Sequence, residues 1–490
     1  MPGSIRVFLA VFFAGVFSLI LELSLLREFV YIFGSTARSN AVIISVFLVG
    51  LAAGSYAGTL PHFRVSPDDA RVRFRQLQTL GILYVFFLYA TKWYFIYHCQ
   101  SPALVYVYFL AMVLVPSFMS GLGYALVVRI LHVHGEHMIT WLYGVSTLGS
   151  VIGGLAHGLL LVPLWGMRSA YLTATLAAAL AGWSMGTAED KRRQVLGWLL
   201  AAAVVLAIVA DPFRRFMYSP RVLFSQDSEF GIVEVWRLKE DYARLSNERI
   251  GSGRHPFPGG TVIDMKVNNV HQSYNLPADR YIHEDWARTS LDIVGRKAKV
   301  LLLGYASGVT ASAYLDYPQT ERLDITENCD PIIAAGRRFF PHEYARVMSD
   351  PRARLVVDDF RGYVRFAREK YDIIALDHSI QDPYQIGFFT TDFFRQLKDI
   401  LAEDGVVILL GDGLSWNTTR LSFRHIYRNN NPAVEPFLQR RCLYLTDRPL
   451  RPAVSGDYKE VLDPPEPGGL VYSDDRVWRW GQGRGDARAG

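Results

Sequence analysis

Long apolar runs fill the first 212 residues of the chain, and short runs of alternating apolar and polar residues fill the rest. A helix that crosses a bilayer needs about 20 mostly apolar residues. Runs that approach this length cover residues 7–29, 40–60, 78–98, 103–130, 139–164, 168–187 and 195–211. The pattern therefore predicts a multi-pass α-helical membrane domain of about seven helices over residues 1–212.

Some of these runs carry glycines at a spacing of four residues. On a helix this spacing makes a smooth groove that another helix can approach closely. Packing within one bundle is the favoured interpretation, and homo-oligomerisation is the alternative. The glycines are Gly50, Gly54 and Gly58, the pair Gly149/Gly153 and the pair Gly154/Gly158.

Charged residues inside the apolar runs are further candidates for function. Glu22 lies in the stretch LILELSLLREF, together with Arg27. A carboxylate at that depth is costly unless it is paired or faces a cavity. We expect a structural ion pair or polar clamp with Arg27, and a ligand or proton pathway is the alternative. Lys92 and His157 are weaker candidates, because a lysine can extend to the interface and a neutral histidine can hydrogen-bond between helices.

Positive charge collects in alternate loops of this half. Loops rich in Lys and Arg remain on the cytoplasmic side of a membrane. The pattern therefore predicts a protein of the cell (inner) membrane with a cytoplasmic N-terminus. With seven spans, the chain after Pro212 would lie outside the cytoplasm. The rich loops hold Arg64, Arg71, Arg73 and Arg75, then Arg129, then Lys191, Arg192 and Arg193, whereas the others hold only Arg38 and Arg168.

The pattern of apolar and polar residues in the second half predicts two kinds of sheet. FGIVEVWRL and TVIDMKVNN are typical strands of a small antiparallel unit, which we place within residues 213–295. From Lys299 onward strands alternate with helices, with KVLLLG, RLDITE, ARLVVDD, YDIIALD and GVVILLG as the strands. Such alternation implies a parallel sheet with right-handed crossovers. We expect an α/β Rossmann-like nucleoside-binding domain over residues 296–475 and a disordered tail over 476–490.

Ligands of a parallel sheet bind at the carboxyl ends of its strands. Gly304 and Gly308 follow the first strand, where their backbone can approach a cofactor. Glu327 follows the second strand, at the position where a ribose diol is gripped. Asp359 follows the third and can accept from an adenine amino group, and Asp377 follows the fourth and faces the transferred group. Together these residues predict a nucleoside site.

Composition excludes two other classes of function. The net charge of +5 is small for 490 residues, and the arginines form no stripe with interleaved aromatics, so we expect no nucleic-acid partner. Cys99, Cys329 and Cys442 lie far apart, without CxxC or Cys/His spacing. We therefore expect neither a metal site nor a disulfide framework.

A series of motifs runs through residues 225–412: NNVHQS, DRYIHE, KVLLLG, ITENCDP, VVDD, YDIIALDHS and FFTTDFFRQLKDILAEDGVV, with a weaker match in YSDDR at 472–476. The series resembles the spermidine/spermine synthase family of aminopropyltransferases, whose catalytic domain has a class I methyltransferase-like fold. In the first half, ELSLLRE, SVFLVGLAAGSYAG and LYGVSTLGSVIGGLAHGLLLVPLWGMR are similar to the branch of this family that is fused to a multi-spanning membrane region.

The resemblance implies a reaction. In this family decarboxylated S-adenosylmethionine donates an aminopropyl group to putrescine, an aspartate helps to deprotonate the amine, and methylthioadenosine leaves. Such chemistry is mainly positioning with help from a general base. Asp377 would be that base, while His283 and Asp382 would contact the polyamine. The partners implied are a small polyamine-like amine, a lipid bilayer, and either a second copy of the chain or a membrane complex. The resemblance implies no metal.

The resemblance also implies how the donor is held. Gln272 would contact the nucleoside, Glu327 the ribose and Asp359 the adenine, above a glycine loop that includes Gly304, Ser307 and Gly308.

This chain departs from the family pattern mainly by losing acids. Where the family has a loop close to G-G-G-D-G-G, Ser307 replaces the aspartate, and Tyr305 and Ala306 replace glycines. Cys329 replaces the second acid of V-E-x-D, and NNVHQ replaces D-G-x-x-Q. Two extra residues lengthen the D-S-x-D-P loop before Asp382. A site meant for dications has thus lost negative charge.

Three functions remain open from the sequence. A membrane-fused aminopropyltransferase-like enzyme, or one with a related adenosyl donor, is favoured by Asp377 and Glu327. A catalytically degenerate binding or assembly subunit is favoured by Ser307 and by the predicted position outside the cytoplasm. A transporter or channel with a sensor domain is favoured by Glu22 and Lys92.

The candidates in the second half also have plain structural interpretations. His283 can cap or brace the helix expected near residues 285–291, and Asp377 can be a strand-end turn residue. His271 and His378 are interpreted as satisfied polar neighbours of the site.

Overall fold

A computed structural model describes most of the chain, in two compact units, Met1–Pro220 and Arg221–Gly490. The described residues are 2–33, 37–63, 65–99, 101–132, 136–186, 191–212, 221–228, 230–251, 255–268, 270–379, 389–410, 416–430, 442–451, 456–463, 470–472 and 477–479.

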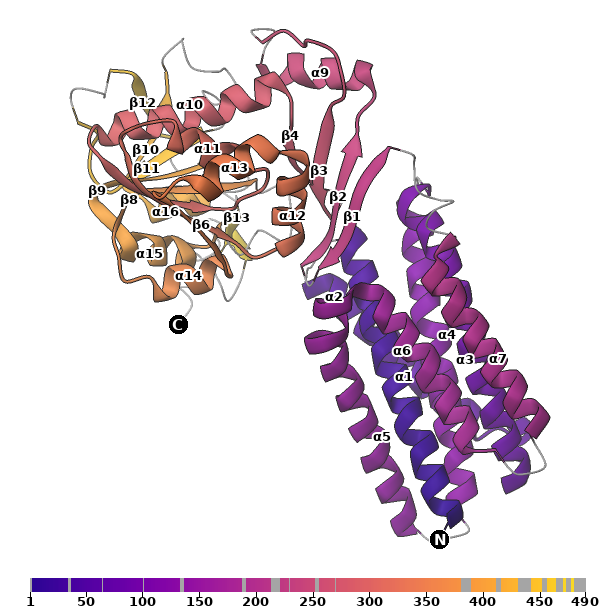
Figure 1. Cartoon of the computed structure of the whole chain (residues 1–490). Coiled ribbons are helices and arrows are strands. Elements are labelled where there is room, and N and C mark those ends of the chain that lie inside the picture. The colour runs from indigo at the N-terminus through magenta and orange to yellow at the C-terminus, as the bar shows by residue number, and fades with distance from the viewer. Residues whose placement is uncertain are drawn as a thin grey trace, which may run out of the picture. The chain divides into compact units, whose positions relative to one another are not determined.

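The described part of the first unit contains seven helices of 20 residues or more, which lie along one bundle axis (Figure 1). They are α1 (Pro2–Phe33), α2 (Ala37–Ala57), α3 (Pro67–Tyr97), α4 (Pro102–His132), α5 (Glu136–Ala156), α6 (Val162–Ser184) and α7 (Lys191–Ala210). Each matches one of the apolar runs of the sequence. The chain enters at one end of the bundle with α1, and α7 ends at the other.

Five helical stretches of this unit are long and apolar enough to cross a membrane: Ile5–Phe29, Asn40–Ala57, Ala103–Leu131, Met138–Ser184 and Lys191–Ala210. Met138–Ser184 contains α5 from Met138 onward, the π-helical turn His157–Leu161 and α6. Within it Gly166 has φ 74° and ψ 176°, a conformation that interrupts the helix and that glycine adopts without strain. These stretches are candidates for membrane spans, and α3 is not among them.

Glycines bring neighbouring helices into close contact. A Cβ on Gly54 would overlap the carbonyl oxygen of Phe118, and one on Gly149 would overlap that of Phe12. Helix α2 therefore packs tightly on α4, and α5 packs tightly on α1. Gly54 and Gly149 therefore serve packing inside the bundle, which is the favoured interpretation of their spacing, whereas a Cβ on Gly158 would meet no atom within 4 Å among the described residues.

A buried ion pair joins α1 to α3. The Lys92 ammonium bonds to the Glu28 carboxylate, and the side chain of each is less than 5% exposed. The Tyr171 hydroxyl of α6 donates to Glu28 Oε1 at 3.1 Å, and its ring lies 4.4 Å from Lys92 Nζ. The expectation that Lys92 extends to the interface is therefore wrong, because a partner within the bundle satisfies its charge. Glu22 is also buried, and its pairing with Arg27 stays a prediction.

The second unit begins with a four-stranded antiparallel sheet in the order β1-β2-β3-β4, as the sequence pattern predicts. Its strands are β1 (Val222–Ser228), β2 (Gly231–Arg237), β3 (Ile263–Val267) and β4 (Val270–Tyr274). Helix α9 (Glu240–Gly251) connects β2 to β3, and α10 (Pro277–Val294) leads into the larger sheet.

The larger sheet has eight strands in the order β12-β10-β11-β9-β8-β5-β6-β7. They are β5 (Ala298–Leu303), β6 (Thr320–Glu327), β7 (Ala353–Val357), β8 (Tyr371–Ser379), β9 (Leu401–Leu410), β10 (His425–Asn429), β11 (Cys442–Thr446) and β12 (Tyr458–Glu460). From β9 to β7 neighbouring strands are parallel, and β11 is antiparallel to β9. This order confirms the predicted Rossmann-like fold, with the reversal of strand order between β5 and β8.

Helices cover both faces of this sheet (Figure 1). They are α11 (Val309–Leu315), α12 (Asp330–Phe339), α13 (Pro341–Ser349), α14 (Phe360–Phe366), α15 (Thr391–Ile400) and α16 (Trp416–Ser422). Along β5, Val300 and Leu302 enter the core that includes Trp286 of α10, whereas Leu301 and Leu303 enter the core that includes Phe393 of α15. A strand buried on both faces reads as a continuous apolar run.

Two further strands, β13 (Leu470–Tyr472) and β14 (Val477–Arg479), form a separate antiparallel pair. β14 lies inside the segment 476–490 for which the sequence predicts a disordered tail, and the rest of that segment is outside the described residues. Asp382, His378's side chain and most of YSDDR also lie outside them.

Candidate active site

The strand-end candidates come together at one edge of the large sheet. Leu303 of β5 pairs with Thr326 of β6 and with Leu376 of β8. Gly304, Glu327 and Asp377 each follow one of these paired residues, so they lie in one row across three adjacent strands. This is the carboxyl edge beside the strand-order reversal, where such sheets bind ligands.

Asp377 and His283 are joined through a third residue. Thr310 Oγ1 donates to Asp377 Oδ2 at 2.6 Å and lies 2.6 Å from Nδ1 of His283. The three residues come from α11, β8 and α10, and Thr310 is 2% exposed. The predicted base and the predicted polyamine-contacting histidine therefore belong to one hydrogen-bonded array, the Asp377–Thr310–His283 array.

The proton directions in this array follow from the chemistry of the groups. A threonine hydroxyl has one hydrogen, and an ionised aspartate only accepts. When Thr310 donates to Asp377, the 2.6 Å contact with His283 requires that Nδ1 carry the proton and donate to Oγ1. Nε2 of a neutral His283 is then an acceptor. This tautomer is assigned from the network of hydrogen bonds.

The loop after β5 is a tight turn built on left-handed residues. Gly304, Ala306 and Gly308 have φ of 110°, 44° and 79°. The Gly304 N–H donates to the Thr326 carbonyl at 3.0 Å, which ties the loop to β6. A positive φ at alanine stores strain, and such strain concentrates at functional loops.

Tyr305 fits this turn because its ring is placed in the core. The residue is 1% exposed and packs with the core residues of α11 and α12. Room comes from Gly336 of α12, where a Cβ would lie 3.0 Å from the ring, and from Gly308, where a Cβ would lie 2.7 Å from the hydroxyl. The replacement of a family glycine by tyrosine thus leaves the turn intact.

Glu327 is held beside this loop. The N–H groups of Tyr305 and Cys329 donate to its two carboxylate oxygens at 3.1 and 3.0 Å. Burial raises the pKa of the carboxyl from 4.5 to about 7, against the lowering effect of the backbone hydrogen bonds. An ionised carboxylate has further lone pairs and can also accept from a diol.

Neutral pairs occupy the positions at which the family has acids. Ser307 Oγ lies 2.8 Å from Ser273 Oγ of β4, and the Cys329 thiol lies 3.4 Å from Ser228 Oγ of β1. Ser307 and Cys329 are both less than 5% exposed. Both pairs join the large sheet to the small one, so the lost charges are replaced by short uncharged contacts.

Gln272 lies beside Ser273 on β4. Met265 and Lys266 of β3 pair with Ser273 and His271, so Gln272 is the extra residue of a β-bulge. Bulges turn side chains toward new directions and are common beside active sites. His271 Nδ1 lies 2.7 Å from Asp264 Oδ1, which agrees with its interpretation as a satisfied polar neighbour.

Asp359 lies at the same carboxyl edge, but it is exposed and engaged locally. Its Oδ1 accepts from the Gly362 N–H at 2.9 Å and caps α14. The capping role explains its position without a ligand, and contact with adenine stays a prediction.

Thr310 is the site residue that sequence reasoning missed. It lies two residues after Gly308, in the first turn of α11. The only feature in the sequence that points to Thr310 is its hydroxyl, which comes shortly after the glycine loop. The position of Thr310 in the sequence does not show that its side chain contacts β8 and α10. Among the described residues there is no cluster of three or more His, Cys, Asp or Glu side chains that could hold a metal.

Several known proteins are similar to this chain in sequence or fold. Residues 280–435 match the family described as "Spermine/spermidine synthase domain". "Polyamine aminopropyltransferase 1" of Streptomyces coelicolor is 26% identical over 419 residues, which cover 82% of this chain and 74% of that protein. "Polyamine aminopropyltransferase 2" of Aquifex aeolicus is 22% identical over 409 residues, covering 82% of this chain and 78% of that protein. The solved spermidine synthase from Thermotoga maritima is 17% identical, with a TM-score of 0.37 over 52% of this chain and 82% of its own.

The aligned regions in the two bacterial proteins are longer than the whole second unit, so the similarity extends into the helical unit. Residues 280–435 are therefore similar to the spermine/spermidine synthase domain, and the chain is similar to polyamine aminopropyltransferases over both of its units.

Proposed function

We propose that the second unit transfers an aminopropyl group from decarboxylated S-adenosylmethionine, or from a closely related adenosyl donor, to an amine. The observation that carries this proposal is the Asp377–Thr310–His283 array, which lies at the ligand edge of a synthase-type sheet. The family match and the named relatives support the same reaction type.

In the proposed reaction the amine nitrogen attacks the propyl carbon that is bonded to sulfur. The new C–N bond forms as the C–S bond breaks. The electron pair of the C–S bond stays on the sulfur of the departing methylthioadenosine. Asp377 takes the proton that the amine loses. Thr310 fixes one carboxylate oxygen, which leaves Oδ1 to face the amine. His283 Nε2 can accept a hydrogen bond from the same acceptor molecule.

Glu327 and the loop that begins at Gly304 hold the nucleoside in this proposal. The loop backbone follows the carboxyl end of β5, and the Glu327 carboxylate accepts from the ribose hydroxyls. Gln272, turned by its bulge, contacts the nucleoside from β4. This arrangement supplies position rather than new chemistry, which is what an in-line displacement requires.

The Ser307–Ser273 and Cys329–Ser228 contacts favour a second candidate, a nucleoside-binding subunit without catalysis. Without acids at these positions, a site that binds a dication loses favourable charge interactions. In this second candidate the fold and the ribose grip are kept, and the chain serves a membrane complex.

We further propose that the first unit is embedded in the cell membrane with its N-terminus in the cytoplasm. The five apolar stretches and the distribution of Arg and Lys support this placement. Because α1 begins and α7 ends at opposite ends of the bundle, the second unit would then lie outside the cytoplasm.

The test supplies both substrates to the purified full-length protein in detergent, so it does not depend on the side of the membrane. Decarboxylated S-adenosylmethionine is offered with putrescine, cadaverine or spermidine, and methylthioadenosine is quantified. The transferase proposal requires amine-dependent release together with a product that is one aminopropyl group heavier. Binding of methylthioadenosine by calorimetry without any such release would overturn it in favour of the binding subunit.

A further inference from the structure

The amino ends of the parallel strands form a charged surface on the side of the large sheet opposite the candidate active site. Ala298 of β5 pairs with Thr320 of β6, and Leu323 of β6 pairs with Ala353 of β7, so these strands begin side by side. β8 is parallel to β5 and begins there too. Helix α14 ends at this surface, because it runs from the carboxyl end of β7 back to the start of β8. We call the surface the basic edge, and it comprises residues 296–299, 320–324, 350–354 and 365–372.

This edge carries most of the excess positive charge of the chain. It holds nine Lys or Arg and five Asp or Glu, a formal net charge of +4, whereas the whole chain has +5. Four of the five acids pair with arginines, among them Glu369 with Arg322 at 3.0 Å and Asp372 with Arg296 at 2.6 Å. The exposed basic side chains that form neither an ion pair nor a hydrogen bond with a described residue are Lys297, Arg354, Arg365 and Arg368.

An exposed aromatic side chain lies within this charged surface. Phe366, the last residue of α14, is 77% exposed, more than any other large apolar side chain that the structure describes. The guanidinium of Arg365 lies 5.9 Å from the centre of its ring. A single exposed phenylalanine is common on protein surfaces, so its place among unpaired cations is what matters. A ring that enters the bilayer interface beside cations that meet lipid phosphates is typical of a surface that lies on a membrane.

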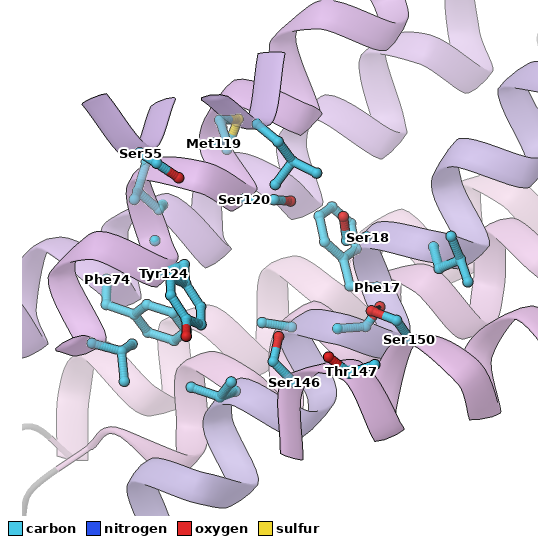
Figure 2. A pocket seen from close by; sticks show the side chains of 18 of the residues that line it. Phe17, Ser18, Ser55, Phe74, Met119, Ser120, Tyr124, Ser146, Thr147 and Ser150 are labelled. Atoms are coloured by element: carbon cyan, nitrogen blue, oxygen red, sulfur yellow. Dashed lines mark hydrogen bonds between the residues drawn. The ribbon is translucent and has the colours of Figure 1, made fainter. Parts of the chain in front are cut away.

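The first unit indicates which anionic surface is within reach. Leu148 and Leu155 of α5 are more than half exposed, whereas the hydroxyl-bearing residues Ser120, Tyr124 and Ser146 line a cavity of about 410 Å³ between helices α1–α5 (Figure 2). Apolar side chains outside and polar ones inside are typical of a helical bundle in lipid. The second unit belongs to the same chain, so anionic headgroups of that lipid can supply the charge that complements the basic edge.

We propose that the basic edge binds anionic lipid headgroups at the membrane surface, with Phe366 in the interface and the four unpaired cations on the phosphates. The inference rests on the proposed membrane embedding of the first unit, and it is independent of the transfer reaction. Ligands of the sheet bind at its carboxyl edge. With the amino edge on lipid, the Asp377–Thr310–His283 array therefore stays open to substrates from water.

The experiment uses the full chain in two kinds of lipid nanodisc, one of phosphatidylcholine alone and one with phosphatidylglycerol added. The photoreactive amino acid benzoylphenylalanine replaces Phe366, or Leu462 as a matched control. Leu462 is 74% exposed and is flanked by Val461 and Asp463. Mass spectrometry identifies the cross-linked lipid or protein. We expect phosphatidylglycerol adducts at position 366, few adducts there in the neutral nanodiscs, and none at position 462.

Removal of charge tests the recognition of headgroups. Arg365→Gln/Arg368→Gln should lower the adducts at position 366 about three- to tenfold, and high salt should lower them as well, because it screens the charges. Arg244→Gln/Arg249→Gln is the control, because it removes the same number of exposed arginines from α9. This control should leave the adducts unchanged.

A probe in the first unit separates failure of this inference from failure of the embedding. Benzoylphenylalanine at Leu148 should form adducts with acyl chains if the bundle is embedded. Adducts at position 148 with none at 366 would overturn the basic edge as a lipid surface. Adducts at 366 that depend neither on phosphatidylglycerol nor on the two arginines, or cross-links from 366 to protein, would overturn it too. No adducts at either position would overturn the embedding, and this inference with it.

Discussion

At the scale of single residues, the site depends on hydrogen bonds that fix the direction of a proton. Asp377 alone is a carboxylate at a strand end, which is a common position for a turn residue. Its contact with Thr310, and the contact of Thr310 with His283, give it one defined orientation. A positioned acid–base group contributes about 10²–10⁴-fold to a rate, and part of that comes from orientation.

Thr310 acts here as a positioning residue. Removal of its hydroxyl should lower kcat while KM stays nearly the same. In Thr310→Val we expect kcat to fall about tenfold with KM nearly unchanged, because the Asp377 carboxylate loses the donor that orients it. Thr310→Ser keeps the hydroxyl and should restore most of the rate. A Ser variant as slow as the Val variant would show that Thr310 matters for packing only.

Glu327 should make nucleoside binding depend on pH. Its pKa is raised to about 7 by burial, so below that pH the folded protein holds the protonated form, which is a poorer partner for a ribose diol. Methylthioadenosine affinity, measured by calorimetry, should be constant above pH 8 and weaken by up to about tenfold per pH unit below pH 7.

In Glu327→Gln the affinity should be lower at pH 8 and nearly independent of pH. A wild-type affinity that stays flat from pH 8 to pH 5 would contradict the role of this carboxylate.

At the scale of elements, glycines decide which helices can touch. Gly54 faces the backbone of α4 directly, whereas a Cβ added to Gly144 of α5 would meet no atom within 4 Å among the described residues. We expect Gly54→Ala to force α2 and α4 apart and to destabilise the unit by about 1–3 kcal/mol, seen as a lower Tm in detergent. Gly144→Ala should leave the Tm equal or slightly higher, because alanine favours the helix. Equal Tm values for both variants would contradict the described packing.

The hydrophobic periodicity of the sequence predicted the helices and strands well. It did not predict the contacts between side chains that lie far apart in the sequence. The run KVLLLG is continuously apolar because β5 is buried on both faces, so its sequence alone identifies a central strand. By contrast, Lys92 of α3 meets Glu28 of α1, and Thr310 of α11 meets Asp377 of β8. Such pairs depend on helix rotation and strand order, which no local pattern contains.

For the molecule as a whole, the proposed membrane embedding makes a prediction about the side on which the second unit lies. The count of Arg and Lys predicts an extracytoplasmic position. A C-terminal alkaline phosphatase fusion should therefore be active in whole cells, and a C-terminal green fluorescent protein fusion should be dark. Phosphatase fused after Gly186, between α6 and α7, should be inactive as the control. The reverse pattern would contradict the predicted orientation.

A comparison of two proteins tests whether Asp377 acts as the base of the proposed aminopropyl transfer. Purified full-length wild type and Asp377→Asn are assayed for amine-dependent methylthioadenosine release, with methylthioadenosine affinity measured on the same samples. We expect Asp377→Asn to keep its methylthioadenosine affinity and to lose about 10²–10⁴-fold in kcat. Equal kcat values for the two proteins, with equal affinity, would contradict it.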